Sequence, residues 1–70
     1  MLSPLTLDGD RVLDGAEAVY WLRREARGLC GPYIALDYRR ADGGVGTVRS
    51  FDGPTREADA RAALERKSRL

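Results

Sequence analysis

Arginine and aromatic side chains form the most suggestive group in this sequence. Tyr20, Trp21, Arg23, Arg24 and Arg27 all fall between positions 20 and 27. Guanidinium groups form paired hydrogen bonds to carboxylates and phosphates and stack on aromatic rings, and Tyr, Trp and Arg carry much of the binding energy at protein interfaces. Their spacing therefore indicates a partner-binding surface rather than a catalytic centre.

Catalytic and metal-binding chemistry finds little support. The chain has no histidine to act as a base near neutral pH, and Cys30 is its single cysteine. A lone thiol without histidine makes a poor zinc site, and its apolar neighbours suggest a small buried side chain. Asp8, Asp10 and Asp14 lie close in sequence, but Asp-Gly pairs are ordinary turn chemistry and the spacing differs from a calcium-binding loop. We expect a non-enzymatic protein with no metal and no cofactor.

Size and charge limit the function further. The 70 residues correspond to a single domain, 1–70, and a net charge of +1 gives no overall attraction to nucleic acid. A chain of this size buries only about 60% of the surface that its unfolded form exposes. We therefore expect association into a homodimer to add stability. No long apolar run or basic leader is present, so the sequence predicts a cytoplasmic protein with no membrane contact.

A helix is predicted over residues 14–27, the segment that contains the arginines. Asp14 is a suitable N-cap with Glu17 as its capping-box partner, and Gly28 fits the position just past the helix end. The helical period creates a polar side, opposite the apolar stripe, that carries Tyr20, Arg23, Arg24 and Arg27, with Trp21 at its edge. This side is the predicted partner-binding surface, and a solvated helix face is the alternative.

Residues 33–51 are predicted to form a β-hairpin at the centre of the fold. β-Branched and aromatic residues occupy both arms, and the Asp-Gly-Gly at 42–44 supplies the turn. We favour a three-residue loop, which puts Val48 on the inner face and keeps Arg49 outside, because arginine is a poor core residue. The outer face is a second candidate surface, made of Tyr33, Asp37, Arg39, Arg49 and Phe51. Its alternative role is a second core face under the C-terminal helix.

Two further elements complete the predicted fold. Asp8-Gly9 marks a turn between short apolar arms, which predicts a short N-terminal strand or hairpin. A helix over residues 55–67 begins at Thr55 and carries an i, i+4 stripe of charges expected to face water, made of Glu57, Arg61, Glu65 and Arg69. The predicted fold is α+β, with a small antiparallel sheet packed against two helices at about 14–27 and 55–67.

Part of the sequence resembles the arm-binding domains of tyrosine recombinases. Those domains run strand, Asp-Gly turn, strand ending in Ser-Phe-Asp, and then Thr-x-x-x-Ala into a helix. The matching residues lie between 33 and 64 and are Asp42, Gly43, Ser50, Phe51, Asp52, Thr55, Asp59 and Ala60. The resemblance implies a small DNA-binding module that uses the hairpin and the basic second helix. A HicB-like antitoxin, similar in its strands and helices, offers a third alternative, an antitoxin-like partner protein.

In overall plan the chain is similar to small phage-encoded inhibitors, anti-CRISPR proteins among them. The similarity lies in the short single domain without cofactor or catalytic residues, and no shared motif carries it. It implies stoichiometric binding to a host protein or nucleoprotein complex in the host cytoplasm. The target would be a CRISPR effector subunit whose access to DNA or to a nuclease is blocked. Inhibition by binding is the predicted function.

Overall fold

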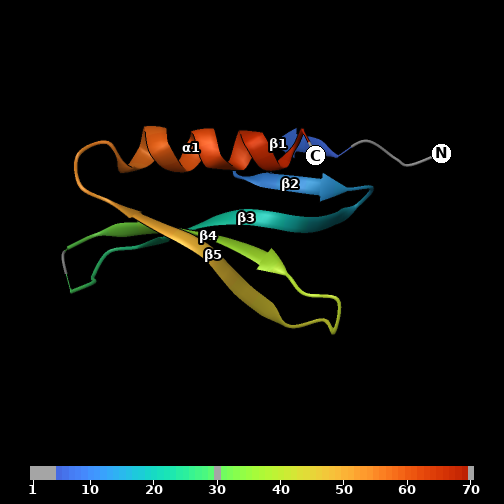
Figure 1. Ribbon diagram of the computed structural model, residues 1–70, viewed down its shortest axis with the longest axis horizontal. Coiled ribbons are helices and arrows are strands. Elements are labelled where there is room, and N and C mark those ends of the chain that lie inside the picture. The colour runs from blue at the N-terminus through green and yellow to red at the C-terminus, as the bar shows by residue number, and fades with distance from the viewer. Residues whose placement is uncertain (1–4, 30, 70) are drawn as a thin grey trace.

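A five-stranded antiparallel sheet and one helix make up the computed structural model, which describes residues 5–29 and 31–69 (Figure 1). The elements in chain order are β1 (Thr6–Asp8), β2 (Arg11–Asp14), β3 (Glu17–Glu25), β4 (Tyr33–Arg39), β5 (Val45–Asp52) and α1 (Arg56–Lys67). Each strand pairs with the next in the chain. α1 packs against β2, β3, β4 and β5 and covers one face of the sheet. The opposite face, on which no described element lies, is called the open face below.

The predicted packing of two helices on the sheet is wrong, because residues 17–25 form β3. Asp14 does not cap a helix but pairs with Glu17 across a tight turn in which Gly15 has a φ of 66°. Val, Tyr and Trp follow one another at positions 19–21, and such residues favour strands. Alternation along the strand then sends Leu22 into the core and its neighbours to the opposite face.

Two Asp-Gly pairs connect the first three strands in the same way. Asp8 pairs with Arg11 around Gly9, which has a φ of 61°, just as Asp14 pairs with Glu17 around Gly15. A positive φ at the first of two central turn residues suits a type II′ hairpin turn, where glycine is favoured. The turn predicted at Asp8-Gly9 is confirmed, and the second Asp-Gly pair, interpreted as a helix start, is also a turn.

The β4–β5 hairpin has the predicted three-residue loop. Arg40 N–H donates to the carbonyl oxygen of Gly44 at 2.8 Å, which leaves residues 41–43 as the loop. Gly43 has a φ of 89°, the left-handed conformation that the sequence requires of it. Next to the loop, Arg39 lies opposite Val45, so the hairpin begins in the expected register.

A β-bulge at Val48 reverses the rest of β5. Asp37 lies opposite Thr47, whereas Leu36 lies opposite Arg49, so Val48 is an extra residue between the two pairs. One extra residue turns the following side chains over. Phe51 therefore enters the core at 7% exposure, while Val48 is 45% exposed. The expected placement of Arg49 on the outer face is wrong for this reason, and Val48 lies on the side of α1 but is exposed at the sheet edge.

The helix predicted over residues 55–67 is confirmed as α1. Thr55 occupies the N-cap position, but its hydroxyl donates to the Asp59 carboxylate at 2.9 Å and caps no backbone N–H. Ala60 and Leu64 are both fully buried against the sheet. Their partners in the core are Val12, Leu22, Ile34, Leu36 and Phe51. Cys30, expected to be buried, lies outside the described residues.

Alanine substitution at positions 51 and 48 tests the bulge. Phe51→Ala is expected to destabilise the fold by about 3–5 kcal/mol, because the ring lies in the core. Val48→Ala is expected to cost less than about 1 kcal/mol, since the side chain is exposed. Urea unfolding followed by circular dichroism measures both, with Phe51→Leu as a milder variant. Without a bulge Val48 would lie inside, and the order of the two effects would be reversed.

Candidate protein-binding surfaces

β3 divides the predicted arginine surface between the two faces of the sheet. Successive side chains of a strand point to opposite faces. Tyr20 and Arg24 lie on the face that α1 covers, where Tyr20 packs against the core and Arg24 bonds to Glu57. Trp21 and Arg23 lie on the open face. The predicted set therefore does not form one continuous surface.

Arg24 belongs to a network of ion pairs that fastens α1 to the sheet. Its guanidinium donates to both carboxylate oxygens of Glu57 at 2.9 Å and to Asp10 Oδ2 at 2.5 Å. Arg61 of α1 donates to Asp10 Oδ1 at 2.7 Å and to the carbonyl oxygen of Gly9. Glu57 and Arg61 therefore bridge to β3 and to the β1–β2 turn, instead of pairing in water as predicted.

A buried carboxylate organises the open face. Asp37 is 3% exposed, although it lies on the face that α1 leaves uncovered. Arg23 Nε donates to Asp37 Oδ2 at 2.8 Å, and Thr47 Oγ1 donates to Asp37 Oδ1 at 2.8 Å. A buried charge is tolerated only when it is paired and hydrogen-bonded, and both oxygens meet this condition. Asp37 therefore fixes side chains of β3, β4 and β5 relative to one another.

Sequence reasoning missed Thr47 as a partner of Asp37. The predicted three-residue loop already places Thr47 opposite Asp37, so the register contained the signal. The alternation of β3 would also have paired Arg23 with the same carboxylate. That information was out of reach as long as residues 14–27 were interpreted as a helix.

Trp21 lies beside this carboxylate and is stacked by an arginine. It is opposite Asp37 in the sheet, and the guanidinium carbon of Arg39 lies 5.8 Å from the centroid of its ring. Arg39 Nε is also 3.2 Å from Glu17 Oε1. A cation over the face of an indole is attracted by the ring, and the ion pair limits its motion. Trp21, partly buried, and Arg39, exposed, thus form an ordered pair.

A shallow hollow lies at one end of the open face, beside the β3–β4 loop. Tyr33, Ser50 and Asp52 line it from β4 and β5, and Arg27 lines it from the loop. Leu29, also in the lining, is fully exposed. This mixture of aromatic, apolar and charged groups resembles the rim of a protein interface.

Three arginines of the open face, Arg11, Arg23 and Arg39, already have carboxylate partners. Their ion pairs, at 2.5 to 3.2 Å, are Arg11–Asp8, Arg23–Glu25, Arg23–Asp37 and Arg39–Glu17. Phosphate binding draws its affinity from cations that neutralise phosphates and release counterions. Neutralised arginines supply little of that, whereas side chains ordered in advance lower the entropy cost of binding a protein surface.

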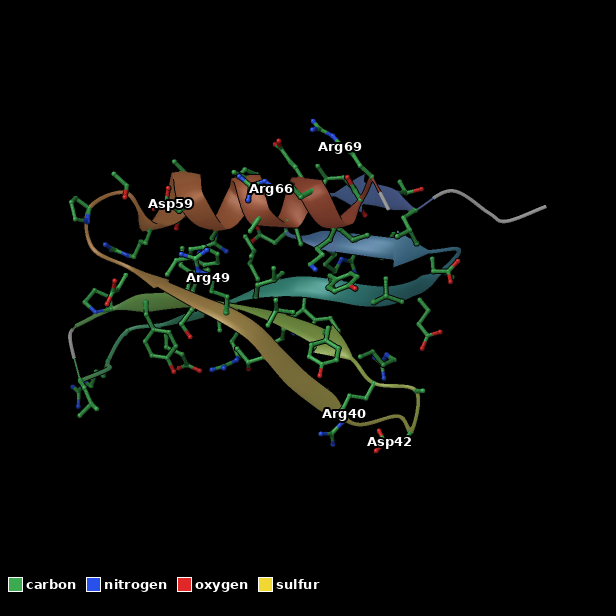
Figure 2. The ribbon with its side chains drawn as sticks, viewed as in Figure 1. Arg40, Asp42, Arg49, Asp59, Arg66 and Arg69 are labelled. Atoms are coloured by element: carbon green, nitrogen blue, oxygen red, sulfur yellow. The ribbon has the colours of Figure 1, made fainter. Side chains whose placement is uncertain are left out.

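The bulge also divides the second predicted surface. Tyr33, Asp37 and Arg39 lie on the open face, but Arg49 and Phe51 lie on the face toward α1. Phe51 is part of the core, so for this residue the alternative of a core face under the C-terminal helix is confirmed. The guanidinium carbon of Arg49 lies 5.0 Å from the Phe51 ring centroid, and Figure 2 shows Arg49 between β5 and α1.

No family model, curated protein or solved structure matches this chain. Within residues 5–29 and 31–69, no helix is long and apolar enough to cross a membrane. In the same ranges, no three acidic or thiol side chains gather into a group that could hold a metal ion.

Replacing Asp37 by alanine is expected to destabilise the protein by about 1.5–3 kcal/mol, the size of a hydrogen bond to a charged group, because Arg23 and Thr47 both lose their acceptor. Thr47→Val, which removes one of the two bonds, should cost less. The matched control is Asp14→Ala, because Asp14 is exposed and takes part in none of the ion pairs of the described residues. This control should change the free energy of unfolding by less than about 0.5 kcal/mol. Urea unfolding measures all three. Equal effects for Asp37 and Asp14 would contradict the organising role.

Acid is expected to weaken the attachment of α1 to the sheet. The hydrogen bond from Arg24 lowers the pKa of Asp10 below its ordinary 3.8, with help from Arg61, and Arg24 lowers the pKa of Glu57 below 4.5. A carboxylate with a depressed folded-state pKa contributes stability above the unfolded value and loses it as the pH falls through the folded value. The melting temperature is followed from about pH 6 to about pH 2. It should begin to decrease once the pH is below the ordinary pKa of Glu57, 4.5, and decrease further below that of Asp10, 3.8. A variant with Asp10→Asn and Glu57→Gln should show a flatter profile, and an unchanged profile would argue against the network.

Proposed function

We propose that this protein is a non-enzymatic binding module that recognises another protein through the open face of its sheet. The observation that carries the proposal is an ordered row of interface-type side chains on a sheet face that the described residues leave uncovered. The row consists of Trp21, Arg23, Tyr33 and Arg39, arranged around the buried Asp37. Trp, Tyr and Arg are the residues that most often dominate binding energy.

Order in the free protein supports this proposal. A long arginine side chain loses considerable conformational freedom when a partner immobilises it. Here Arg23 is already fixed by Asp37 and Glu25, and Arg39 by Trp21 and Glu17. Most of the ordering cost therefore falls on folding and not on binding. The mixed charge of the face also suits a protein surface of mixed charge.

Inhibition of a host nucleoprotein complex is the setting that we propose for this binding. Its support is the similarity in plan to small phage-encoded inhibitors, together with a binding face that has no catalytic group among its described residues. A CRISPR effector subunit is the first partner to test. The homodimer expected from the sequence stays a prediction, and it would have to form through another surface, because a second copy on the open face would occupy the surface that the partner needs.

Blocking and truncating substitutions on the open face test the proposal. An affinity pull-down from a bacterial lysate that contains CRISPR effectors, with mass spectrometry, identifies the partner, and its affinity is then measured with purified components. Ser50→Tyr adds bulk to the exposed open face without removing a described contact, and Trp21→Ala with Arg39→Ala removes the stacked pair. Both variants should lose at least about tenfold in affinity. Arg69→Ala, in the exposed turn that follows α1, is the matched control and should change the affinity by less than about twofold.

Melting temperatures near the parent value show that the variants fold. Unchanged partner binding by Ser50→Tyr would overturn the proposal. Light scattering supplies the second decisive readout: a dimer that Ser50→Tyr dissociates would show that a second copy covers the open face, which would also overturn it.

A further inference from the structure

We infer that the groove between β5 and α1 binds an extended acidic segment of a partner protein, which adds as a strand to the free edge of β5. This groove lies away from the open face, and the inference is independent of the function proposed above. The occupant is a strand whose groove-facing residues, at every second position, carry apolar and acidic side chains in turn. Three features of the described residues support this choice: the unpaired edge of β5, the apolar lining of the groove, and its basic side chains.

Among the described residues, β5 is an edge strand whose outer side is unpaired. It pairs with β4 alone, and the sheet order ends at it. Its eight residues contrast with the three of β1, the other edge strand. Half of the backbone N–H and C=O groups of such a strand point outward, where an extended peptide can pair with them. Val45 and Val48 are 51% and 45% exposed along this strand.

Apolar side chains form the floor of the groove. Leu36, Val48, Phe51 and Ala63 line one hollow between β5 and α1. A second hollow, lined by Ala62 and sharing Phe51 and Ala63 with the first, also lies between the two elements. Every other side chain of an added strand would face this floor. An aliphatic side chain of the peptide would therefore be buried there.

Basic side chains line the groove and favour an acidic occupant. Arg49 comes from β5, and Arg66 and Lys67 come from α1; Figure 2 shows Arg49 between the two elements with Arg66 on the helix above it. Unlike Arg11, Arg23 and Arg39 of the open face, these three take part in none of the ion pairs of the described residues. Asp59 is the one acidic residue in the lining. Carboxylates at groove-facing positions of the peptide would form ion pairs with these cations.

The same charges act against pairing with a second copy. Two β5 edges joined around a twofold axis would bring Arg49 of one copy near the Arg49 of the other, together with the neighbouring cations of α1. Like charges placed opposite each other in a sheet are destabilising. The bulge at Val48 also interrupts the regular edge, a device that limits unspecific strand pairing. An acidic partner segment meets neither obstacle in the stretch that follows Val48.

Fluorescence anisotropy with labelled synthetic peptides provides the test. The probes are a peptide of the repeat Val-Ser-Glu-Ser, which puts valine and glutamate on the same face of a strand, a matched peptide with lysine in place of glutamate, and the glutamate peptide N-methylated at alternate residues on its hydrogen-bonding edge. The glutamate peptide should bind at least about tenfold tighter than the other two. Equal binding by the N-methylated peptide would show that charge alone acts and would overturn strand addition.

Protein variants place the peptide on the molecule. Arg49→Glu with Arg66→Glu should weaken binding of the glutamate peptide at least about tenfold, and Arg69→Glu, which reverses the charge at a residue outside the groove lining, should change it less than about threefold. The open-face variant Trp21→Ala with Arg39→Ala, on β3 and β4 and away from the β5 edge, should leave peptide binding unchanged, so this inference and the proposed function fail separately. A single-stranded DNA oligonucleotide that binds tighter than the peptide and displaces it would assign the groove to nucleic acid instead and overturn the inference.

Discussion

Burial of Phe51 beneath α1 depends on one extra residue, Val48, in β5. The chain has a single described helix, so only one face of the sheet can be covered, and the large apolar residues must lie on that face. β3 and β4 satisfy this condition by simple alternation, with Leu22, Ile34 and Leu36 on the covered side. β5 starts in a register that would turn Phe51 away, and the bulge corrects it. The same correction sends Arg49 toward α1 and creates the basic side of the groove.

Ion pairs serve two separate purposes in this small domain. On the covered face, Asp10 with Arg24 and Arg61 ties the first turn of the sheet to the helix that lies over it. Such partly exposed pairs contribute little each, and their value here is the position that they give to α1. On the open face, Asp37 is buried and must be paired, so the neighbouring side chains are ordered even where no element packs on them. A surface without a covering layer can in this way be as well defined as a core.

The sequence predicted the local elements better than it predicted which side chains lie on each face of the sheet. The hairpin, its three-residue loop, the first Asp-Gly turn and the C-terminal helix follow from turn chemistry and helix signals that act over a few residues. The second Asp-Gly pair is compatible with both a hairpin turn and a helix cap, and Glu17 and Gly28 favoured the wrong alternative. The β-branched and aromatic run at 19–21 was the stronger signal. A bulge has no comparable local signature, because it arises from the need to bury Phe51, so the two candidate surfaces were each assembled from residues that belong on different faces.

The connection of each strand to its chain neighbour has a consequence for biosynthesis. Every strand pairing in this sheet is local, so hairpins can form one after another as the nascent chain leaves the ribosome, with small loop-closure entropy. α1 follows all five strands in the chain, and its residues Ala60 and Leu64 share the core with Ile34, Leu36 and Phe51. Until α1 emerges, the sheet has two uncovered faces and a free edge at β5. This interval is when the nascent protein is most exposed to aggregation and chaperone binding.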